Sequence, residues 1–125
     1  MKLKVIGFSR ILLGLIFFVF GLNGFFDFLP HTPPPAESEA FTAAYFFPFV
    51  KVVETACGAL LLFNLFVPLA TVLITPVVVN ILLFHLFLDV QGLIIAIPLV
   101  LLNGVLAFGY WDSFKPMLRM RAKPV

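Results

Sequence analysis

Two ionisable side chains that could exchange protons stand inside long apolar stretches of this sequence. Glu54 lies between Phe49 and Val67, and His85 lies near the end of the next apolar stretch. A charged residue at the centre of a membrane-spanning helix costs about 2.5–3.5 kcal/mol, so Glu54 must be paired, protonated or hydrated. Lys51 offers a partner on the same helix, and His85 offers one on another helix. Glu54 is therefore either an interhelical polar clamp or a ligand or proton site.

The polar residues of the apolar stretches fall at two depths, because a helix rises about 1.5 Å per residue. The outer group is a candidate site for a proton or for a quinone, lipid or other amphipathic ligand, and comprises Asn23, Asp27, Lys51, Glu54, Asn80, His85 and Asp89. The inner polar group comprises Arg10, Asn64, Thr71, Thr75 and Asn103. A lone histidine is more often a hydrogen-bonded core residue than a metal ligand, so we predict no metal site.

Several kinds of enzyme chemistry lack their residues in this sequence. Cys57 is the only cysteine, so the dithiol chemistry of a CxxC pair is excluded within one chain. His31 lies in a Pro-rich loop, which leaves His85 without a second histidine for haem. There is no phosphate-binding glycine loop and no HExxH motif. No complete catalytic set is present, and no cofactor is evident, so an enzyme is disfavoured.

The amino-acid composition is that of an integral membrane protein. Hydrophobic residues make up 62% of the 125 residues and charged residues only 11%, with a mean hydropathy of +1.17. A soluble domain has about 25% charged residues. A disordered chain and a nucleic-acid-binding protein are excluded. We predict a single-domain, all-α integral membrane protein that spans residues 1–125 and has the lipid bilayer as its surroundings.

The apolar stretches predict four membrane spans that pack as a four-helix bundle. The predicted spans cover residues 5–29, 49–67, 68–88 and 92–111. Between the first two, Phe41, Tyr45 and Phe49 recur every four residues, which favours a short interfacial helix over residues 36–47. An irregular loop is the alternative. Residues 112–125 form a basic tail.

The basic residues predict the orientation. Seven of the eight lie before or within the start of the first span or after the last span. Basic residues favour the cytoplasmic side, so we predict that both termini are cytoplasmic. The acidic residues Glu37, Glu39 and Asp89 then fall on the opposite side.

Small residues share one face of the first span, where they would let another helix approach closely. The predicted packing glycines are Gly7, Gly14, Gly21 and Gly24, together with Gly58 on the second span.

Three segments resemble membrane proteins of the DoxX family. They are RILLGLIFFVFGLNGF from Arg10, KVVETACGALLLFNLFVPLA from Lys51 and VVVNILLFHLFLD from Val77. The resemblance covers residues 5 to about 111 and implies a four-helix protein of the bacterial cytoplasmic membrane. Some members of the family are described as subunits of a thiosulfate:quinone oxidoreductase or as partners of redox-defence proteins, so the resemblance implies a quinone as a cofactor.

Three functions remain open on the sequence. The preferred one is an accessory or scaffold subunit of a membrane complex, quinone-linked by the resemblance, that binds other membrane proteins or itself. The alternative is a binder of a small amphipathic ligand in the outer group around Glu54 and His85. The third is a small oligomeric transporter or channel, ranked last because the two halves show no internal repeat.

Overall fold

The computed structural model describes residues 3–26 and 46–125, and within these residues every regular element is a helix. The long helices are α1 (Leu3–Phe26), α3 (Phe47–Leu62), α4 (Val67–Phe87) and α5 (Leu93–Gly109). The short elements are the 3-10 helix η2 (Val90–Gly92), the helix α6 (Trp111–Phe114) and the 3-10 helix η3 (Lys115–Leu118). The all-α prediction is confirmed.

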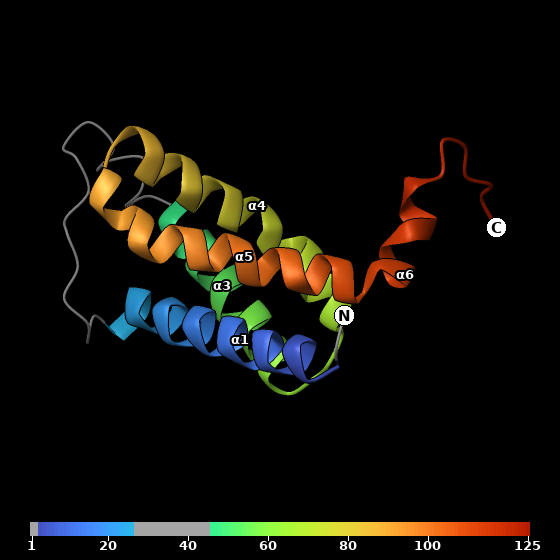
Figure 1. Ribbon diagram of the computed structural model, residues 1–125, viewed down its shortest axis with the longest axis horizontal. Helices are drawn as coiled ribbons and strands as arrows, with labels where there is room; N and C mark the ends of the chain where they lie inside the picture. The colour runs from blue at the N-terminus through green and yellow to red at the C-terminus, as the bar shows by residue number, and fades with distance from the viewer. Residues whose placement is uncertain (1–2, 27–45) are drawn as a thin grey trace.

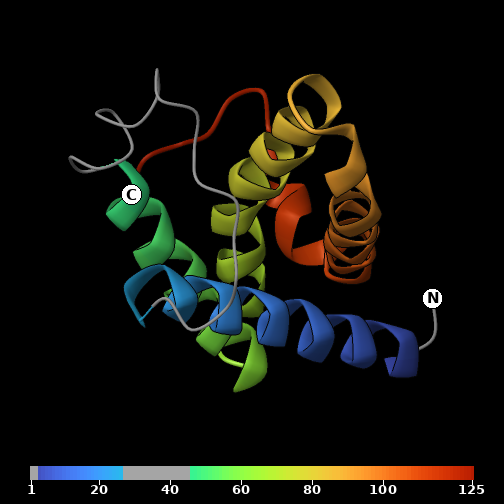
Figure 2. The same ribbon diagram turned by 90° about the vertical axis from the view of Figure 1, so that its left-hand side faces the viewer.

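The long helices pack in a ring, in which α1 and α4 each contact both α3 and α5. Successive helices run in opposite directions, so the start of α1 and the end of α5 lie at the same end of the array (Figure 1). The Ile6 side chain lies 2.9 Å from the position that a Cβ on Gly109 would take, which places these two helix ends side by side. Seen from the end, α1 lies across the array, while α5 is viewed nearly along its axis (Figure 2).

Three stretches in the described part of the chain are long and apolar enough to cross a membrane. They are Leu3–Phe26, Val67–Phe87 and Val90–Gly109, the last formed by η2 and α5 together. The helix α3 has 16 residues, fewer than the approximately 20 that a span needs. The predicted fourth span therefore stays a prediction. Residues 36–45 of the predicted interfacial helix lie outside the described residues, and Phe47, its last residue, begins α3.

The core and the outer surface are both apolar. Leu13, Phe17, Leu61, Ile74 and Leu106 are at most 1% exposed and pack in one cluster where the helices meet. Large apolar side chains also cover the outside of every long helix. An apolar surface of this extent is typical of a protein whose surroundings are lipid rather than water.

The helix α3 ends at Leu62, five residues before the predicted end at Val67, because the chain turns sharply at Asn64. Asn64 has a φ of 57°, the left-handed conformation that Asn tolerates better than most residues. The backbone N–H of Leu65 donates to Leu60 O at 2.9 Å, and that of Asn64 donates to Leu61 O at 3.4 Å. These two bonds are those of a Schellman motif, which closes a helix C-terminus.

Arg10 on α1 completes this helix end. Its Nη1 donates to Leu61 O and to Leu62 O, the latter at 3.3 Å. A cation is favoured at a helix C-terminus by the helix dipole and by the carbonyl groups that the last turn presents there. Arg10 therefore links the start of α1 to the end of α3.

Candidate functional site

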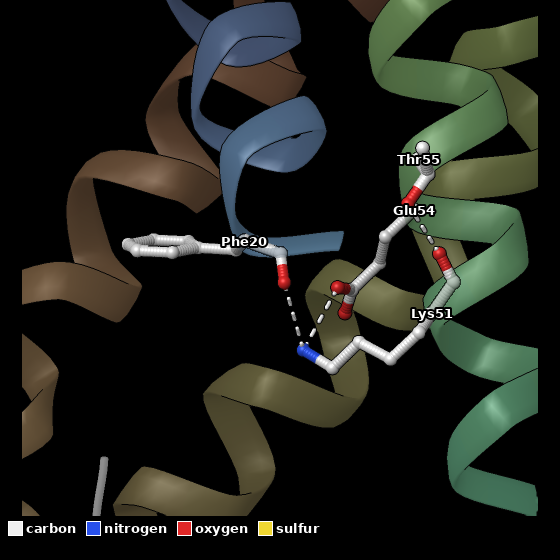
Figure 3. A network of polar contacts seen from close by, with 4 residues as sticks. All are labelled: Phe20, Lys51, Glu54 and Thr55. Carbon is white, nitrogen blue, oxygen red and sulfur yellow. Dashed lines mark hydrogen bonds and ion pairs between the residues drawn. The ribbon is translucent and has the colours of Figure 1, made fainter. Parts of the chain in front are cut away.

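The α3 residues Lys51 and Glu54 form an ion pair on the side of α3 that faces α1. Lys51 Nζ donates to Glu54 Oε2 at 3.1 Å, and the two side chains are 18% and 6% exposed, respectively. Lys51 Nζ also lies 3.5 Å from Phe20 O on α1, so the ammonium stands between a carboxylate and a backbone carbonyl (Figure 3). The ring of Phe47 lies 5.2 Å from the same ammonium. The Lys51 ammonium thus contacts the Glu54 carboxylate, the Phe20 carbonyl and the ring of Phe47.

This ion pair lies where α1 and α3 come close together. A Cβ on Gly24 would lie 2.5 Å from Lys51 Cδ, and one on Gly21 would lie 2.6 Å from the backbone nitrogen of Thr55. The Thr55 hydroxyl donates to Lys51 O at 2.8 Å, within α3. The absence of side chains at the two glycines is what allows Lys51 and Thr55 to lie against α1.

Two further glycines lie in the same contact. A Cβ on Gly14 would lie 2.9 Å from Leu61 Cβ, and one on Gly58 would lie 2.8 Å from Phe18 Cα. Gly7 differs from the packing prediction, because a Cβ there would meet no other part of the protein within 4 Å. Gly7 is therefore not needed for close helix approach, although its neighbour Ile6 packs against Gly109 on α5.

The structure places His85 with Asp89 rather than with Glu54, contrary to the predicted cross-helix partner. His85 Nδ1 lies 3.7 Å from Asp89 Oδ2 and 3.3 Å from Asp89 O. A Cβ on Gly92 would lie 2.8 Å from His85 Cγ. His85 therefore joins the end of α4 to the turn before α5, while Glu54 pairs within α3.

The other members of the outer group differ in how far they are buried. Asn80 is exposed on α4, whereas Asn23 is half-buried near the end of α1. Asp27 lies outside the described residues. The structure thus resolves the outer group into the pairs Lys51–Glu54 and His85–Asp89, with Asn80 apart from both.

The inner polar group contains one interhelical network. Asn103, buried on α5, donates from Nδ2 to Thr75 Oγ1 on α4 at 3.2 Å. The Thr75 hydroxyl donates to Thr71 O at 2.6 Å, and the Thr71 hydroxyl donates to Val67 O at 2.8 Å. These bonds join α4 to α5, and the two remaining members, Arg10 and Asn64, close the end of α3.

Residues that sequence reasoning missed form a shallow apolar groove of about 220 Å³. It lies between the start of α4 and the elements α6 and η3, and we call it the α4–α6 groove. Its lining residues are Pro68, Leu69, Val72, Ser113, Phe114 and Met117. The apolar residues among the basic residues after Trp111 could have indicated that this segment packs against a helix.

Metal and thiol chemistry find little support in the described residues. Within residues 3–26 and 46–125, no group of three or more His, Cys, Asp or Glu side chains could hold a metal ion. The thiol of Cys57 is buried in the apolar core. Cys57 therefore packs as a small apolar residue.

Comparison with known proteins gives one family. The family model described as DoxX matches residues 5–86, from the start of α1 almost to the end of α4. The match includes Arg10, both residues of the Lys51–Glu54 pair, and His85. Searches of curated proteins and of solved structures returned no match.

Proposed function

This chain belongs to the DoxX family, and from that premise we propose that it is an accessory or scaffold subunit of a membrane protein complex. It would act by binding other membrane proteins within the bilayer, rather than by catalysing a reaction. The proposal rests on two observations. The buried polar residues contact one another or a neighbouring helix, and Asn80 is an exposed polar residue on α4.

The buried polar side chains are engaged in holding helices together. Glu54 is 6% exposed and paired with Lys51 at 3.1 Å within α3. Lys51 Nζ also donates to Phe20 O on α1 at 3.5 Å, so the pair is linked to α1 through the lysine, which supports the structural clamp over the ligand site. Asn103 is likewise bonded to Thr75 on the neighbouring helix. Residues committed to such contacts are not free to take a proton or a ligand without breaking the contact, which argues against a catalytic role for them.

The observation that carries the proposal is the exposed amide of Asn80. It stands in the second half of α4, a helix long and apolar enough to cross a membrane. Among the residues that the structure describes, no side chain or backbone group is hydrogen-bonded to the side-chain amide of Asn80. An unpaired amide in an apolar medium costs about 1–3 kcal/mol by protein mutational data. A polar group from another membrane protein would remove that cost.

The surroundings of Asn80 fit a protein partner. The exposed residues on the same side of α4, which we call the Asn80 face, are Leu73, Pro76, Leu83, Phe84 and Phe87. They provide an apolar surface with one hydrogen-bonding group near its middle. Transmembrane helices associate by such packing combined with an interhelical hydrogen bond.

The charge distribution supports the proposed orientation. The start of α1, which carries Lys4 and Arg10, lies at the same end of the array as α6 and η3 (Figure 1). η3 begins with the basic residue Lys115 and is followed by Arg119. By the positive-inside rule this end is cytoplasmic. We therefore place both termini in the cytoplasm of a bacterium, with His85 and Asp89 towards the outer side.

A cross-linking experiment in native membranes tests the proposal. A photoreactive residue at Leu83, on the Asn80 face, is expected to cross-link to a different membrane protein, and Asn80→Leu is expected to remove that product. A photoreactive residue at Leu101, exposed on α5, is the control position. Val79→Leu, beside Asn80 but off its face, is the control substitution and should leave the product unchanged.

The same membranes, extracted in mild detergent, distinguish the outcomes. Co-purification of the cross-linked protein with the wild-type chain, and its loss with Asn80→Leu, supports an accessory subunit. Recovery of this chain alone, or of copies of this chain only, contradicts it.

A further inference from the structure

The chain after α5 combines exposed apolar and basic side chains at one end of the molecule. Trp111 is 45% exposed and Met117 is 60% exposed, while Phe114 turns inward and is 8% exposed. The exposed basic residues of this segment are Lys115, Arg119, Arg121 and Lys123. Asp112 is its one acidic side chain. The segment therefore presents a net positive charge next to apolar surface.

Two of these basic residues are within two positions of a lining residue of the α4–α6 groove, since Lys115 follows Phe114 and Arg119 is the second residue after Met117. Its walls are the first two turns of α4 on one side and Ser113, Phe114 and Met117 of α6 and η3 on the other. Leu69 and Val72, on the α4 wall, are 52% and 40% exposed, so the groove is accessible from the outer surface of α4. Its volume of about 220 Å³ is below the range of pockets that enclose a whole drug-sized ligand. A groove of that size and openness suits part of a flexible chain.

We propose that this end of the molecule binds an anionic phospholipid. One acyl chain lies in the α4–α6 groove, and the phosphate lies beside Lys115 and Arg119. Charge complementarity selects this occupant, since a negative headgroup is attracted by basic residues next to a membrane. A diffuse attraction to the membrane surface would need only the charges, whereas the apolar groove offers a place for the acyl chain of one lipid.

Trp111 provides a natural reporter for the test, because it is the only tryptophan of the chain and lies two residues before the lining residue Ser113. The full chain is reconstituted into vesicles of phosphatidylcholine with a minor fraction of phosphatidylglycerol. In one sample the acyl chains of phosphatidylglycerol are brominated, and in the other an equal amount of phosphatidylcholine is brominated. Bromine quenches tryptophan fluorescence only at close range, so the comparison reports which lipid is enriched at Trp111.

The wild-type chain is expected to be quenched more strongly by brominated phosphatidylglycerol. Both leaflets contain it, so the orientation of the protein in the vesicle does not affect the result. Equal quenching by the two brominated lipids would overturn the proposal.

Two charge-matched double variants separate a site from general electrostatic attraction. Lys115→Gln with Arg119→Gln removes the proposed phosphate partners, and enrichment should fall about fivefold for each removed charge. Arg121→Gln with Lys123→Gln removes the same charge further along the tail and should have a clearly smaller effect. An equal loss in the two double variants would show that the attraction is diffuse and would overturn the site.

A third variant tests the groove without changing the charge. Val72→Phe partly fills the groove from the α4 wall, and because Val72 is already 40% exposed, the larger side chain can be accommodated. It should lower the preference for phosphatidylglycerol towards that of the Lys115/Arg119 double variant. Unchanged enrichment with Val72→Phe would contradict a bound acyl chain in the groove. Circular dichroism of each variant checks that the helix content is kept.

Discussion

Gly21 on α1 lies so close to Thr55 on α3 that a Cβ at Gly21 would be 2.6 Å from the Thr55 backbone nitrogen. Real Cβ atoms essentially never approach a backbone atom so closely. The two helices are therefore in backbone contact next to the Lys51–Glu54 pair, since Thr55 directly follows Glu54. Close backbone approach at small residues is the usual means by which helices associate in lipid.

Gly21→Ala is expected to destabilise the protein by about 1–3 kcal/mol, the usual cost of overpacking. Gly7→Ala is the matched control on the same helix, since nothing lies within 4 Å of its new Cβ. It should be neutral, or more stable by up to about 1 kcal/mol, because Ala favours a helix more than Gly. Unfolding in mixed detergent with increasing dodecyl sulfate, followed by circular dichroism, measures both. Equal stabilities of the two variants would contradict the close contact at Gly21.

Lys51→Met is expected to cost about 3 kcal/mol, the lower end of the range for removing one partner of a buried ion pair. The loss arises because Glu54, with 6% of its side chain exposed, keeps its buried carboxylate without the ammonium. Glu54→Leu should cost less, because the Lys51 side chain is 18% exposed and can extend its ammonium towards solvent.

The double variant Lys51→Met with Glu54→Leu completes a thermodynamic cycle. It should be more stable than the sum of the single losses predicts, since replacing both charges by apolar groups removes the unpaired partner. The same unfolding assay measures the coupling energy. Strictly additive losses would argue against a direct ion pair and for a separate role of Glu54.

Asn64→Ala is expected to cost about 1 kcal/mol, because Asn64 has a φ of 57° and Ala tolerates the left-handed conformation poorly. Asn64→Gly is the matched variant and should be nearly neutral or stabilising, since Gly adopts this conformation freely. Asn64 is exposed, so neither change disturbs the core. A loss of stability in the glycine variant as large as in the alanine variant would contradict the turn.

The apolar stretches and the small residues predicted much of the helix arrangement. Arg10 is the only charged residue between Val5 and Phe26, which indicated a long first helix. The structure has α1 from Leu3 to Phe26. The glycines of one helical face predicted a close neighbour, and Gly21 and Gly24 lie against α3. Both inferences depend only on helical periodicity and composition, which are local properties of the sequence.

The partners of the polar residues were predicted less well. The i, i+3 spacing predicted Lys51 as the local partner of Glu54, and the structure has that pair. Residues placed at the same depth by an ideal helical rise still differ in the neighbour that each one faces, so the alternative cross-helix partner His85 contacts Asp89 instead. The early end of α3 was not predicted, because the residues on both sides of Asn64 are apolar and a single left-handed residue does not interrupt such a run. Which helix a side chain faces depends on tertiary packing, which the sequence of one chain does not reveal.

The bonds from Arg10 to the end of α3 have a consequence for biosynthesis. The acceptors Leu61 O and Leu62 O lie 51 and 52 residues after Arg10 in the chain. While the ribosome makes the intervening residues, the guanidinium has no such acceptors and is best solvated by water and headgroups at the membrane surface. We therefore expect Arg10 to anchor α1 at that surface during insertion and to exchange this contact for the two carbonyls once α3 has been made.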